Sequence, residues 1–465
     1  MLEILKSIYD NGLSIVMMVL LILVGVFLTV RTKVFQFRKF GYVMKNTVGG
    51  LFDKSQHEKD RKSVSPFQAV TTALAGTIGT GSIAGVATAL VSGGPGAIFW
   101  MWISALLGMV TKYSEIVLSL KYRETTKFGS LIGGPMYYMQ NGLKAKWLGV
   151  IFSLFAMVAC IGTGNATQSN AISEVASKSL SISPYITGGV LTVVVALVIL
   201  GGVKRIAAIN EKLVPFMAVF FIIISIIALC CNITNVPAAF ALIFKEAFNF
   251  KSVFGGVAGY GIFRAMRFGV GRGVFTNEAG LGSAPIAHAA SSEKDPVKQG
   301  LWGVFEVFIT TIIICTMTAL VVLTSDVYQA GLSTQKFAYD GAALSSEAFN
   351  EAIPFVGNIG VSLATVFFSL STILGWAYYG EVSVGYVFSK KRELAIMIYR
   401  IVYVAFTFVG AVASLDIVWL VADIFNVLMA LPNLIALVAL SKVVVNLTKE
   451  HFNKKKEQET AVEEN

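Results

Sequence analysis

Two glycine-rich clusters interrupt apolar segments that would otherwise cross a membrane as continuous helices. The first runs from Ala75 to Ala84 and the second from Asn277 to Ala287, and each contains the pattern G-x-G-S. Glycine tolerates the backbone angles of an unwound helix and lets a ligand approach the main chain. Unwinding at mid-membrane also frees N–H and C=O groups that lipid cannot satisfy, so these groups must face a cavity, an ion or a ligand. The clusters therefore predict two interrupted helices that bind something small.

The ends of the half-helices indicate which ligands suit them. Their N-terminal amides attract an anion such as a carboxylate, and the freed carbonyls can coordinate a small cation. The alternative is that G-x-G-S only allows close helix packing, because small residues line membrane helix interfaces. Gly79-x-Gly81-x-x-Ala84 also fits the letters of a dinucleotide fingerprint. That motif requires a preceding strand and a downstream acidic residue, and an apolar helical context excludes it.

The elements that position these clusters are membrane helices. The chain has 465 residues, of which 55% are hydrophobic and only 14% charged. This composition excludes a disordered or collagen-like chain, and the net charge of +10 is spread between apolar runs rather than forming a nucleic-acid surface. A spanning helix needs about 20 mostly apolar residues. We therefore predict an all-α polytopic membrane protein with eleven helices, near 14–30, 66–91, 96–120, 147–173, 184–201, 206–231, 266–291, 298–324, 355–388, 393–412 and 417–445.

Lys and Arg residues are concentrated in alternate loops, which predicts the orientation of the chain. The loop from 31 to 65 is the richest. If it is cytoplasmic, alternation places inside the basic segments 121–127, 144–146, 204–212, 294–298, 390–392 and 442–456. We therefore expect a multi-pass protein of the plasma membrane. Its N-terminus is then outside the cell and its C-terminus in the cytoplasm. Arg31 and Lys33 follow the first apolar segment without a cleavage site, so we expect that segment to be a retained helix.

The two clusters lie in helices that are five helices apart, so these helices start on opposite sides of the membrane. This is the pattern of an inverted repeat of two five-helix halves, each opening with an interrupted helix. The predicted organisation is a single transmembrane domain with an extra N-terminal helix at 14–30, a first repeat at 66–231, a second repeat at 252–445 and a polar cytoplasmic tail at 446–465.

Smaller signals concern single residues. Ser65 is a predicted helix cap, with Pro66 at the first helical position and Gln68 completing a capping box. The four cysteines lie in or at the ends of apolar runs without a C-x-x-C motif, which indicates core residues rather than disulfides or a metal site.

Four stretches resemble one family, the alanine or glycine:cation symporters, which are the prokaryotic sodium:alanine symporters. They are Gly93–Trp102, Gly133–Tyr138, Asn277–Pro285 and Thr372–Glu381. The resemblance extends over residues 14–445. It implies the five-plus-five inverted-repeat transporter fold with one extra N-terminal helix, and a small neutral amino acid carried with sodium and without an organic cofactor.

For such a zwitterionic substrate, the amides of Thr80 and Gly81 suit the carboxylate. Carbonyls of the second cluster suit the ammonium, and the substrate-binding candidates there are Thr276, Asn277, Gly280 and Gly282. Glu278 leaves two interpretations open, a negative charge for the substrate or an internal role such as pairing with Arg272.

The segment 162–170 is unusually polar for a membrane helix. Its Gln168 and Asn165 indicate a cavity wall, and Gln168 is a further substrate candidate. Which of the two contacts the substrate is left open.

The resemblance also implies a sodium site. Its ligands would be the carbonyls of Ala75 and Ile78 with the hydroxyls of Ser371 and Thr372, although ordinary helix-to-helix hydrogen bonding would equally account for the hydroxyls. A second ion near Thr77, Ser82 and Thr276 has less support. Trp376 lies one helical turn beyond Thr372, and we predict that it limits substrate size.

The same sequence features leave alternative functions open. A proton-coupled or glutamine-type carrier of the same fold is the main alternative. A channel or a membrane enzyme is disfavoured, because neither a filter-like repeat nor a catalytic motif is present. The sequence does not determine the oligomeric state.

Overall fold

The computed structural model describes residues 3, 6–7, 9–49, 64–127, 129–248, 258–334, 336–413 and 415–463. Four basic residues of the predicted cytoplasmic loop, and the predicted start of the second repeat at residue 252, lie outside the described residues. The four are Lys54, Lys59, Arg61 and Lys62.

Eight helical segments among the described residues are long and apolar enough to cross a membrane. They are formed by α2 (Ser14–Arg31), α7 (Gly96–Lys121), α9 (Lys146–Ile161) with η5 (Gly162–Ala166) and α10 (Thr167–Leu180), α12 (Gly202–Cys231), α16 (Pro296–Val307) with η8 (Phe308–Cys315) and α17 (Thr316–Leu323), α20 (Val356–Val387), α21 (Arg392–Val412) and α22 (Leu415–Ala439). The shorter α11 (Pro184–Ile199) is also apolar. The structure is therefore that of a helical, multi-pass membrane protein.

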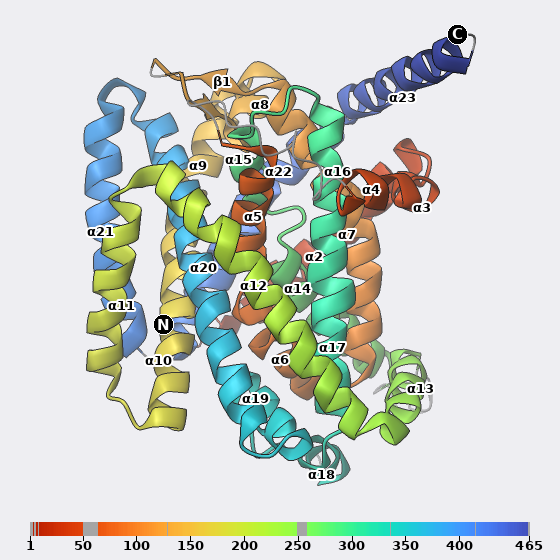
Figure 1. The fold of residues 1–465 in the computed structure, drawn as a ribbon, viewed down its shortest axis with the longest axis vertical. Helices are drawn as coiled ribbons and strands as arrows, with labels where there is room; N and C mark the ends of the chain where they lie inside the picture. Colours follow the sequence, from red (N-terminus) through yellow and green to blue (C-terminus); the bar gives the residue numbers. More distant parts are fainter. Residues whose placement is uncertain are drawn as a thin grey trace.

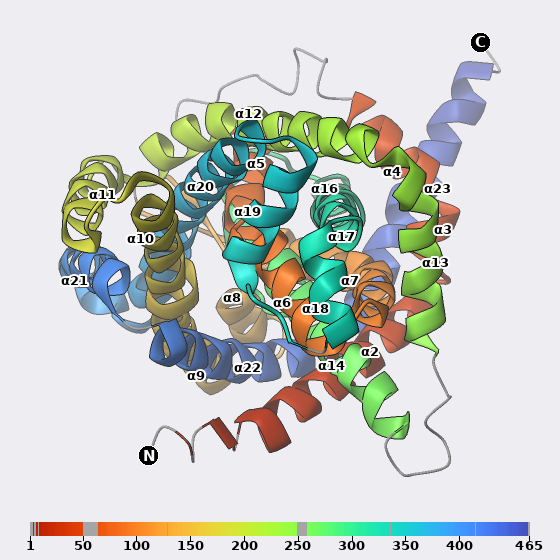
Figure 2. The same cartoon turned by 90° about the horizontal axis from the view of Figure 1, so that it is seen from below.

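Both glycine clusters interrupt helices, as the sequence predicts. The first separates α5 (Pro66–Thr77) from α6 (Ala84–Gly93), and the second separates α14 (Ala258–Asn277) from α15 (Ala284–Ala289). The long helices stand side by side in Figure 1. Viewed from one end, α5 and α6 lie at the centre, surrounded by α7, α12, α16 and α20 (Figure 2). The interrupted helix α5–α6 is thus enclosed by other helices, whereas the first half of α14 lies at the outside of the bundle and exposes Phe263.

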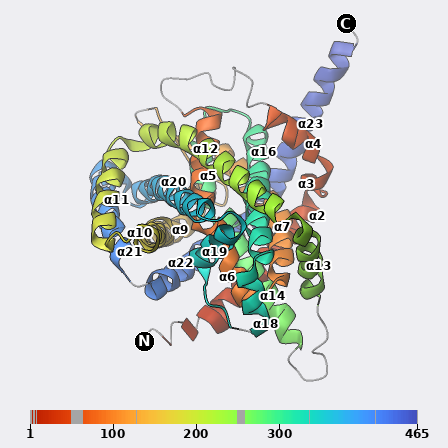
Figure 3. The ribbon, with the colours of Figure 1, turned by 60° about the horizontal axis from the view of Figure 1, so that its bottom comes forward.

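Large apolar side chains on the outer helices face away from the protein. Examples are Val190 on α11, Val219 on α12 and Ile401 on α21, each more than half exposed. Helices α11 and α21 pack against each other at the edge of the molecule (Figure 3). Such a surface would not be stable in water, and it matches contact with lipid chains.

The cysteine prediction is right for two residues and wrong for two. Cys160 and Cys315 are buried, but Cys230 and Cys231 are exposed. The difference arises because α12 ends at Cys231, where the helix leaves the packed interior.

Short elements between the long helices carry no membrane-span signal and were not predicted. At one end of the molecule lie the hairpin of β1 (Glu124–Thr125) and β2 (Leu131–Ile132) and the helix α8 (Pro135–Asn141). At the other end lie α13 (Val236–Ala247), α18 (Asp326–Thr334) and α19 (Gly341–Ala352) (Figure 1). The remaining short helices, α3 (Phe35–Arg38) and α4 (Phe40–Asn46), follow α2.

The C-terminal region differs from its predicted boundaries. The last predicted span, 417–445, ends earlier, at Ala439, and a separate helix α23 (Ser441–Glu463) includes most of the segment predicted as a polar tail. His451 of α23 is 2.6 Å from the Asp295 carboxylate and 3.1 Å from the Tyr42 hydroxyl. Burial by itself would raise the pKa of Asp295, but the hydrogen bonds from His451 and from two backbone amides lower it. The polar composition of this segment predicts a tail. Composition does not reveal the contacts of α23, because they are made with residues far away in the chain.

The predicted capping box at the start of α5 is confirmed. The Gln68 amide donates to the Ser65 hydroxyl at 3.1 Å, and the Gln68 side chain accepts from the Ser65 amide at 3.2 Å. Pro66 is the first helical residue. The cap fixes where the first interrupted helix begins.

Candidate functional site

The first interruption is narrow because other side chains come very close to its backbone. A Cβ on Gly79 would lie 2.7 Å from the Thr372 hydroxyl, and a Cβ on Gly81 would lie 2.8 Å from the Thr276 hydroxyl. A real Cβ does not approach another heavy atom so closely. Glycine is therefore required at both positions for α14 and α20 to meet the interruption.

The second interruption needs glycine for a different reason. Glu278, Gly280 and Gly282 all have positive φ, of 56°, 93° and 81°. Glycine adopts these angles without strain, whereas a side chain such as that of Glu278 is rarely found there. Three residues between α14 and α15 therefore have a left-handed backbone conformation.

Three of the four predicted sodium ligands lie together. The Thr372 hydroxyl is 2.8 Å from the Ala75 carbonyl oxygen, and the Ser371 hydroxyl is 3.5 Å from the same oxygen. Ile78 directly follows the last residue of α5 and is buried. Without an ion, both hydroxyls donate to carbonyls. These oxygens are of the type that a hard cation prefers.

Gln168 lies at the first interruption and Asn165 does not. The Thr80 amide donates to the Gln168 side-chain oxygen at 3.2 Å. Asn165 instead donates to the backbone of Tyr403 on α21 at 2.6 Å. Within the polar segment 162–170, Gln168 therefore lies at the first interruption, whereas Asn165 contributes to helix packing.

Three buried hydroxyl oxygens near the first interruption, those of Thr80, Ser82 and Tyr379, have no hydrogen-bond partner among the described residues. The Tyr379 hydroxyl is close to Gly76, since a Cβ there would be 2.8 Å away. A buried polar group without a partner is costly, so a ligand or ion that supplied one would be stabilised at this position.

The second interruption directs most of its polar groups away from the first. The Asn277 carbonyl accepts from Lys112 at 2.8 Å, and the Asn277 side chain contacts Thr311 and the Ala279 amide. The Gly280 amide donates to Glu115 at 3.1 Å. The Asn277 carbonyl, one of those expected to accept an ammonium, is thus already bound by a group of the protein.

Asn433 on α22 completes this second set of contacts. Its side-chain amide donates to the Gly280 carbonyl at 2.9 Å. A Cβ on Gly282 would meet Pro135, Phe152 and Asn433, all on other helices. Gly282 therefore lies at a close contact with α8, α9 and α22. Thr276 is the candidate of this cluster that lies beside the first interruption.

Trp376 joins the two interruptions. Its indole N–H is 2.8 Å from the Glu278 carboxylate and 3.3 Å from the Gly76 carbonyl. Glu278 also accepts a hydrogen bond from Ser283. Gly164 makes room for the indole, because a Cβ there would lie 2.2 Å from the Trp376 Cβ. Glu278 is thus held by Trp376 and Ser283, whereas Arg272, its suggested partner, lies 3.8 Å from Asp423.

A buried ionic network supports the second interruption, and sequence reasoning missed its central residue. The Lys112 ammonium is 3.4 Å from Glu306, and both side chains are fully buried. Glu306 in turn lies 2.6 Å from His288 Nε2, and His288 Nδ1 lies 2.8 Å from the Gln299 side chain. The signal was available in the sequence: Lys112 is a lysine inside a 26-residue apolar helix, and such residues mark functional or structural polar sites.

The comparisons with known proteins agree with this geometry. A family model described as the sodium:alanine symporter family matches residues 1–465. The sodium/alanine symporter AgcS of Methanococcus maripaludis is 46% identical over 439 residues, covering 93% of each chain. The probable sodium/glutamine symporter GlnT of Bacillus subtilis is 38% identical, covering 95% of this chain and 89% of that protein. The structure of MhsT in complex with L-phenylalanine matches with a TM-score of 0.57 at 12% identity, covering 83% of this chain and 98% of that one.

The Lys112–Glu306 pair yields a stability prediction. Lys112→Met should strongly lower the melting temperature of the purified protein, because it leaves Glu306 buried without its cation, a loss of about 3–5 kcal/mol. Lys112→Met combined with Glu306→Gln should recover part of that loss. The control is Lys178→Met, which removes an exposed pair with Glu174 and should change stability by less than about 1 kcal/mol. An unchanged melting temperature for Lys112→Met would show that the pair contributes no stability.

Proposed function

The chain belongs to the sodium:alanine symporter family, and on that basis we propose that it brings a small neutral amino acid into the cell together with sodium. Alanine is the first substrate that we expect and glycine the second. The observation that carries the proposal is the meeting of the interrupted helix α5–α6 with the Ser371 and Thr372 hydroxyls of α20. Glutamine is the alternative substrate, because a relative named as a probable sodium/glutamine symporter is 38% identical.

We propose that eleven membrane elements form two inverted five-helix repeats after the extra helix α2. The first repeat would begin with α5–α6 and end with α12, and the second would begin with α14–α15 and end with α22. Two features support this arrangement. Each first element carries the G-x-G-S interruption, and each last helix contains an internal proline, Pro215 in α12 and Pro432 in α22.

The N-terminus is proposed to lie outside the cell and the C-terminus in the cytoplasm. The end of the molecule that carries β1, α8 and α23 in Figure 1 would then be cytoplasmic. This end carries the basic residues Lys127, Lys390, Lys391 and Arg392, as expected for cytoplasmic loops.

We propose that one sodium ion binds between α5 and α20. The carbonyls of Ala75 and Ile78 and the hydroxyls of Ser371 and Thr372 would be its ligands. The two hydroxyls would turn their protons away from the ion and keep their contacts with the Phe368 carbonyl. At the second interruption the Lys112 ammonium already binds the Asn277 carbonyl. A second ion near Thr77, Ser82 and Thr276 stays a prediction.

The substrate is proposed to bind beside the sodium ion at the first interruption. Its carboxylate would face the Gly81 amide and the unpartnered Thr80 hydroxyl, and the Thr80 amide would have to release Gln168 to join them. Its ammonium would face the Thr276 hydroxyl and the Gln168 side-chain oxygen, both of which lie against the interruption. Trp376 would border the side-chain space and limit substrate size.

Sodium coupling is tested first with the unmodified protein in proteoliposomes. Uptake of radiolabelled alanine should require an inward sodium gradient at constant pH, and should persist when a proton ionophore abolishes any pH gradient. Equal uptake with potassium replacing sodium would contradict sodium coupling, and uptake driven by a pH gradient alone would favour the proton-coupled alternative. Competition by glycine and glutamine ranks the substrates.

The ion site is tested with Thr372→Ala. The apparent sodium affinity should fall about ten-fold, because a hydroxyl ligand to a charged ion is lost, whereas alanine affinity at saturating sodium should change little. The matched control is Thr365→Ala on the same helix, since the Thr365 hydroxyl is bonded only within that helix, to the Val361 carbonyl. An unchanged sodium dependence in Thr372→Ala would place the ion elsewhere.

The substrate site is tested with Gly81→Ala. The added Cβ would have to displace the Thr276 and Phe275 side chains, so alanine binding should be largely lost, and the melting temperature should fall only as far as this local shift requires, with membrane insertion preserved. Gly189→Ala on α11 is the control, because no atom lies within 4 Å of its added Cβ. Wild-type transport by Gly81→Ala would show that this glycine serves only packing.

A further inference from the structure

A large cavity lies at the end of the molecule that carries β1 and α8, beside the start of α5 and the end of α15. Its volume is about 1170 Å³, which is the size of a pocket for a ligand much larger than alanine. Its walls come from the β1–β2 hairpin, α8, the start of α12, the end of α20 and the start of α21. A small neutral substrate does not by itself account for the size or the basic lining of this cavity.

The cavity has a strong excess of positive charge. Lysine and arginine contribute seven of its lining residues, and aspartate and glutamate contribute three. Arg400 is bound to Glu381 by two hydrogen bonds of 2.7 and 2.8 Å, so this pair is neutral. The remaining basic residues are Lys127, Lys146, Lys204, Lys390, Lys391 and Arg392, against Glu124 and Glu393.

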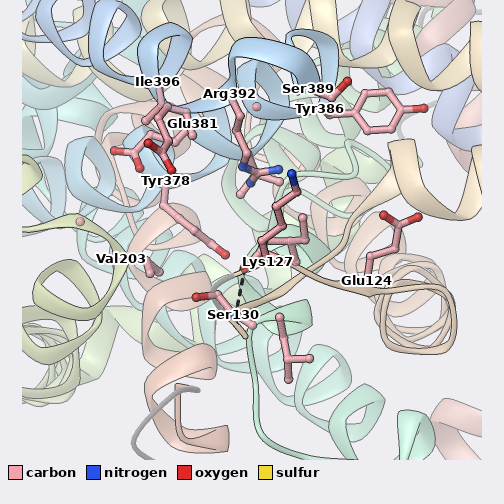
Figure 4. A pocket seen from close by; sticks show the side chains of 18 of the residues that line it. Glu124, Lys127, Ser130, Val203, Tyr378, Glu381, Tyr386, Ser389, Arg392 and Ile396 are labelled. Carbon is pink, nitrogen blue, oxygen red and sulfur yellow. Dashed lines mark hydrogen bonds between the residues drawn. The ribbon is translucent and has the colours of Figure 1, made fainter.

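Two of the cations meet in the cavity. In Figure 4, Lys127 and Arg392 enter from opposite sides and their charged ends point toward the same region. Lys127 comes from the turn of the hairpin, which is closed by the hydrogen bonds of Thr126 with Ser130. Two like charges that face each other are unfavourable unless an anion lies between them.

Arg392 is held in place by the surrounding structure. It lies against Gly385, where an added Cβ would be 2.9 Å from the guanidinium carbon. It is also hydrogen-bonded to the Tyr137 hydroxyl. Because Arg392 is the first residue of α21, the positive end of that helix dipole adds to the same potential. The arginine is thus positioned by a glycine, a tyrosine and a helix start rather than lying free on the surface.

The cavity also touches a contact between the start of the first interrupted helix and the end of the second. Val64, just before α5, and Ala290, just after α15, both line it. The Ser292 amide donates to the Val64 carbonyl at 2.9 Å, and Arg123 donates to the Ser291 carbonyl at 2.7 Å. A ligand in the cavity would contact both sides of this closed contact and favour the state in which it is made.

We propose that this cavity is a binding site for a phosphate-bearing anion, with Lys127 and Arg392 as its main ligands. The phosphate belongs either to an anionic lipid headgroup or to a soluble phosphate compound. Bound there, the anion holds this end of the molecule closed and slows transport. The effect on transport rests on the proposed symport function, whereas the binding itself does not.

Binding is tested on the purified full-length protein with inorganic pyrophosphate as the soluble probe. The melting temperature should rise with pyrophosphate at low salt, and isothermal titration should give a dissociation constant. Lys127→Gln combined with Arg392→Gln should weaken that binding about ten-fold or more, because charge-assisted hydrogen bonds are lost. Gly385→Ala should also weaken it without any change of charge, since the added Cβ displaces Arg392. Lys336→Gln, an exposed lysine at the other end of the molecule, is the control.

A second arm uses nanodiscs of phosphatidylcholine with or without phosphatidylglycerol. Stabilisation that requires phosphatidylglycerol and is lost in the double variant supports the site with a lipid headgroup as its source. Stabilisation by pyrophosphate alone supports it with a soluble source. The proposal is overturned if neither probe binds, if the double variant binds as tightly as the wild type, or if Lys336→Gln loses as much. In proteoliposomes, luminal pyrophosphate or phosphatidylglycerol, whichever binds, should slow alanine uptake by the wild type and not by the double variant.

Discussion

A helix that is interrupted inside a membrane must find partners for its freed backbone groups within the protein. Lipid offers no hydrogen bonds, so every N–H and C=O released by unwinding must be bound by a side chain, an ion or a ligand. This protein has two such interruptions, and the packing around them follows from that requirement. Both interruptions are buried, and α5–α6 lies at the centre of the surrounding helices.

The two interruptions meet the requirement in different ways. The second is bound mainly by protein groups: Lys112 binds the Asn277 carbonyl, and Glu115 and Asn433 bind the Gly280 amide and carbonyl. The first keeps the Ala75 carbonyl against two hydroxyls and leaves the Thr80 hydroxyl without a partner. One interruption is therefore a fixed support, and the other offers groups that a transported ion and substrate would satisfy. Trp376 connects the two through Gly76 and Glu278.

Buried charge is the second consequence. Lys112 and Glu306 form a pair in a region where an isolated ion would be very costly, and they are tolerated because each has the other and further hydrogen bonds. The charges at the β1 and α8 end are arranged differently. There only Glu381 and Arg400 form a close pair at the cavity, and the surrounding excess of lysine and arginine leaves a positive potential. The same chain thus uses a close ion pair for internal support and an excess of one charge sign where a ligand can approach.

The sequence by itself determined the class of protein, the two interrupted helices and the capped start of the first. These features depend on composition and on local patterns: apolar length, the glycines of G-x-G-S, and the Ser65–Gln68 capping box. It also placed Ala75, Ser371 and Thr372 in one proposed site, through resemblance to a family rather than through geometry. The short helices between spans and the helix α23 escaped prediction, because polar interfacial elements have no membrane-span signal.

Only the tertiary structure decided how the candidate residues divide. Asn277, Gly280 and Gly282 share a motif with the site, yet helices α7, α8, α9 and α22 bind or cover them. Asn165 and Gln168 lie one turn apart, and only Gln168 reaches the first interruption. Sequence patterns give a residue's type and its position along one helix, but not which neighbouring helix its polar groups face. That choice depends on contacts between residues 88 to 238 positions apart, so it is made when the helices pack.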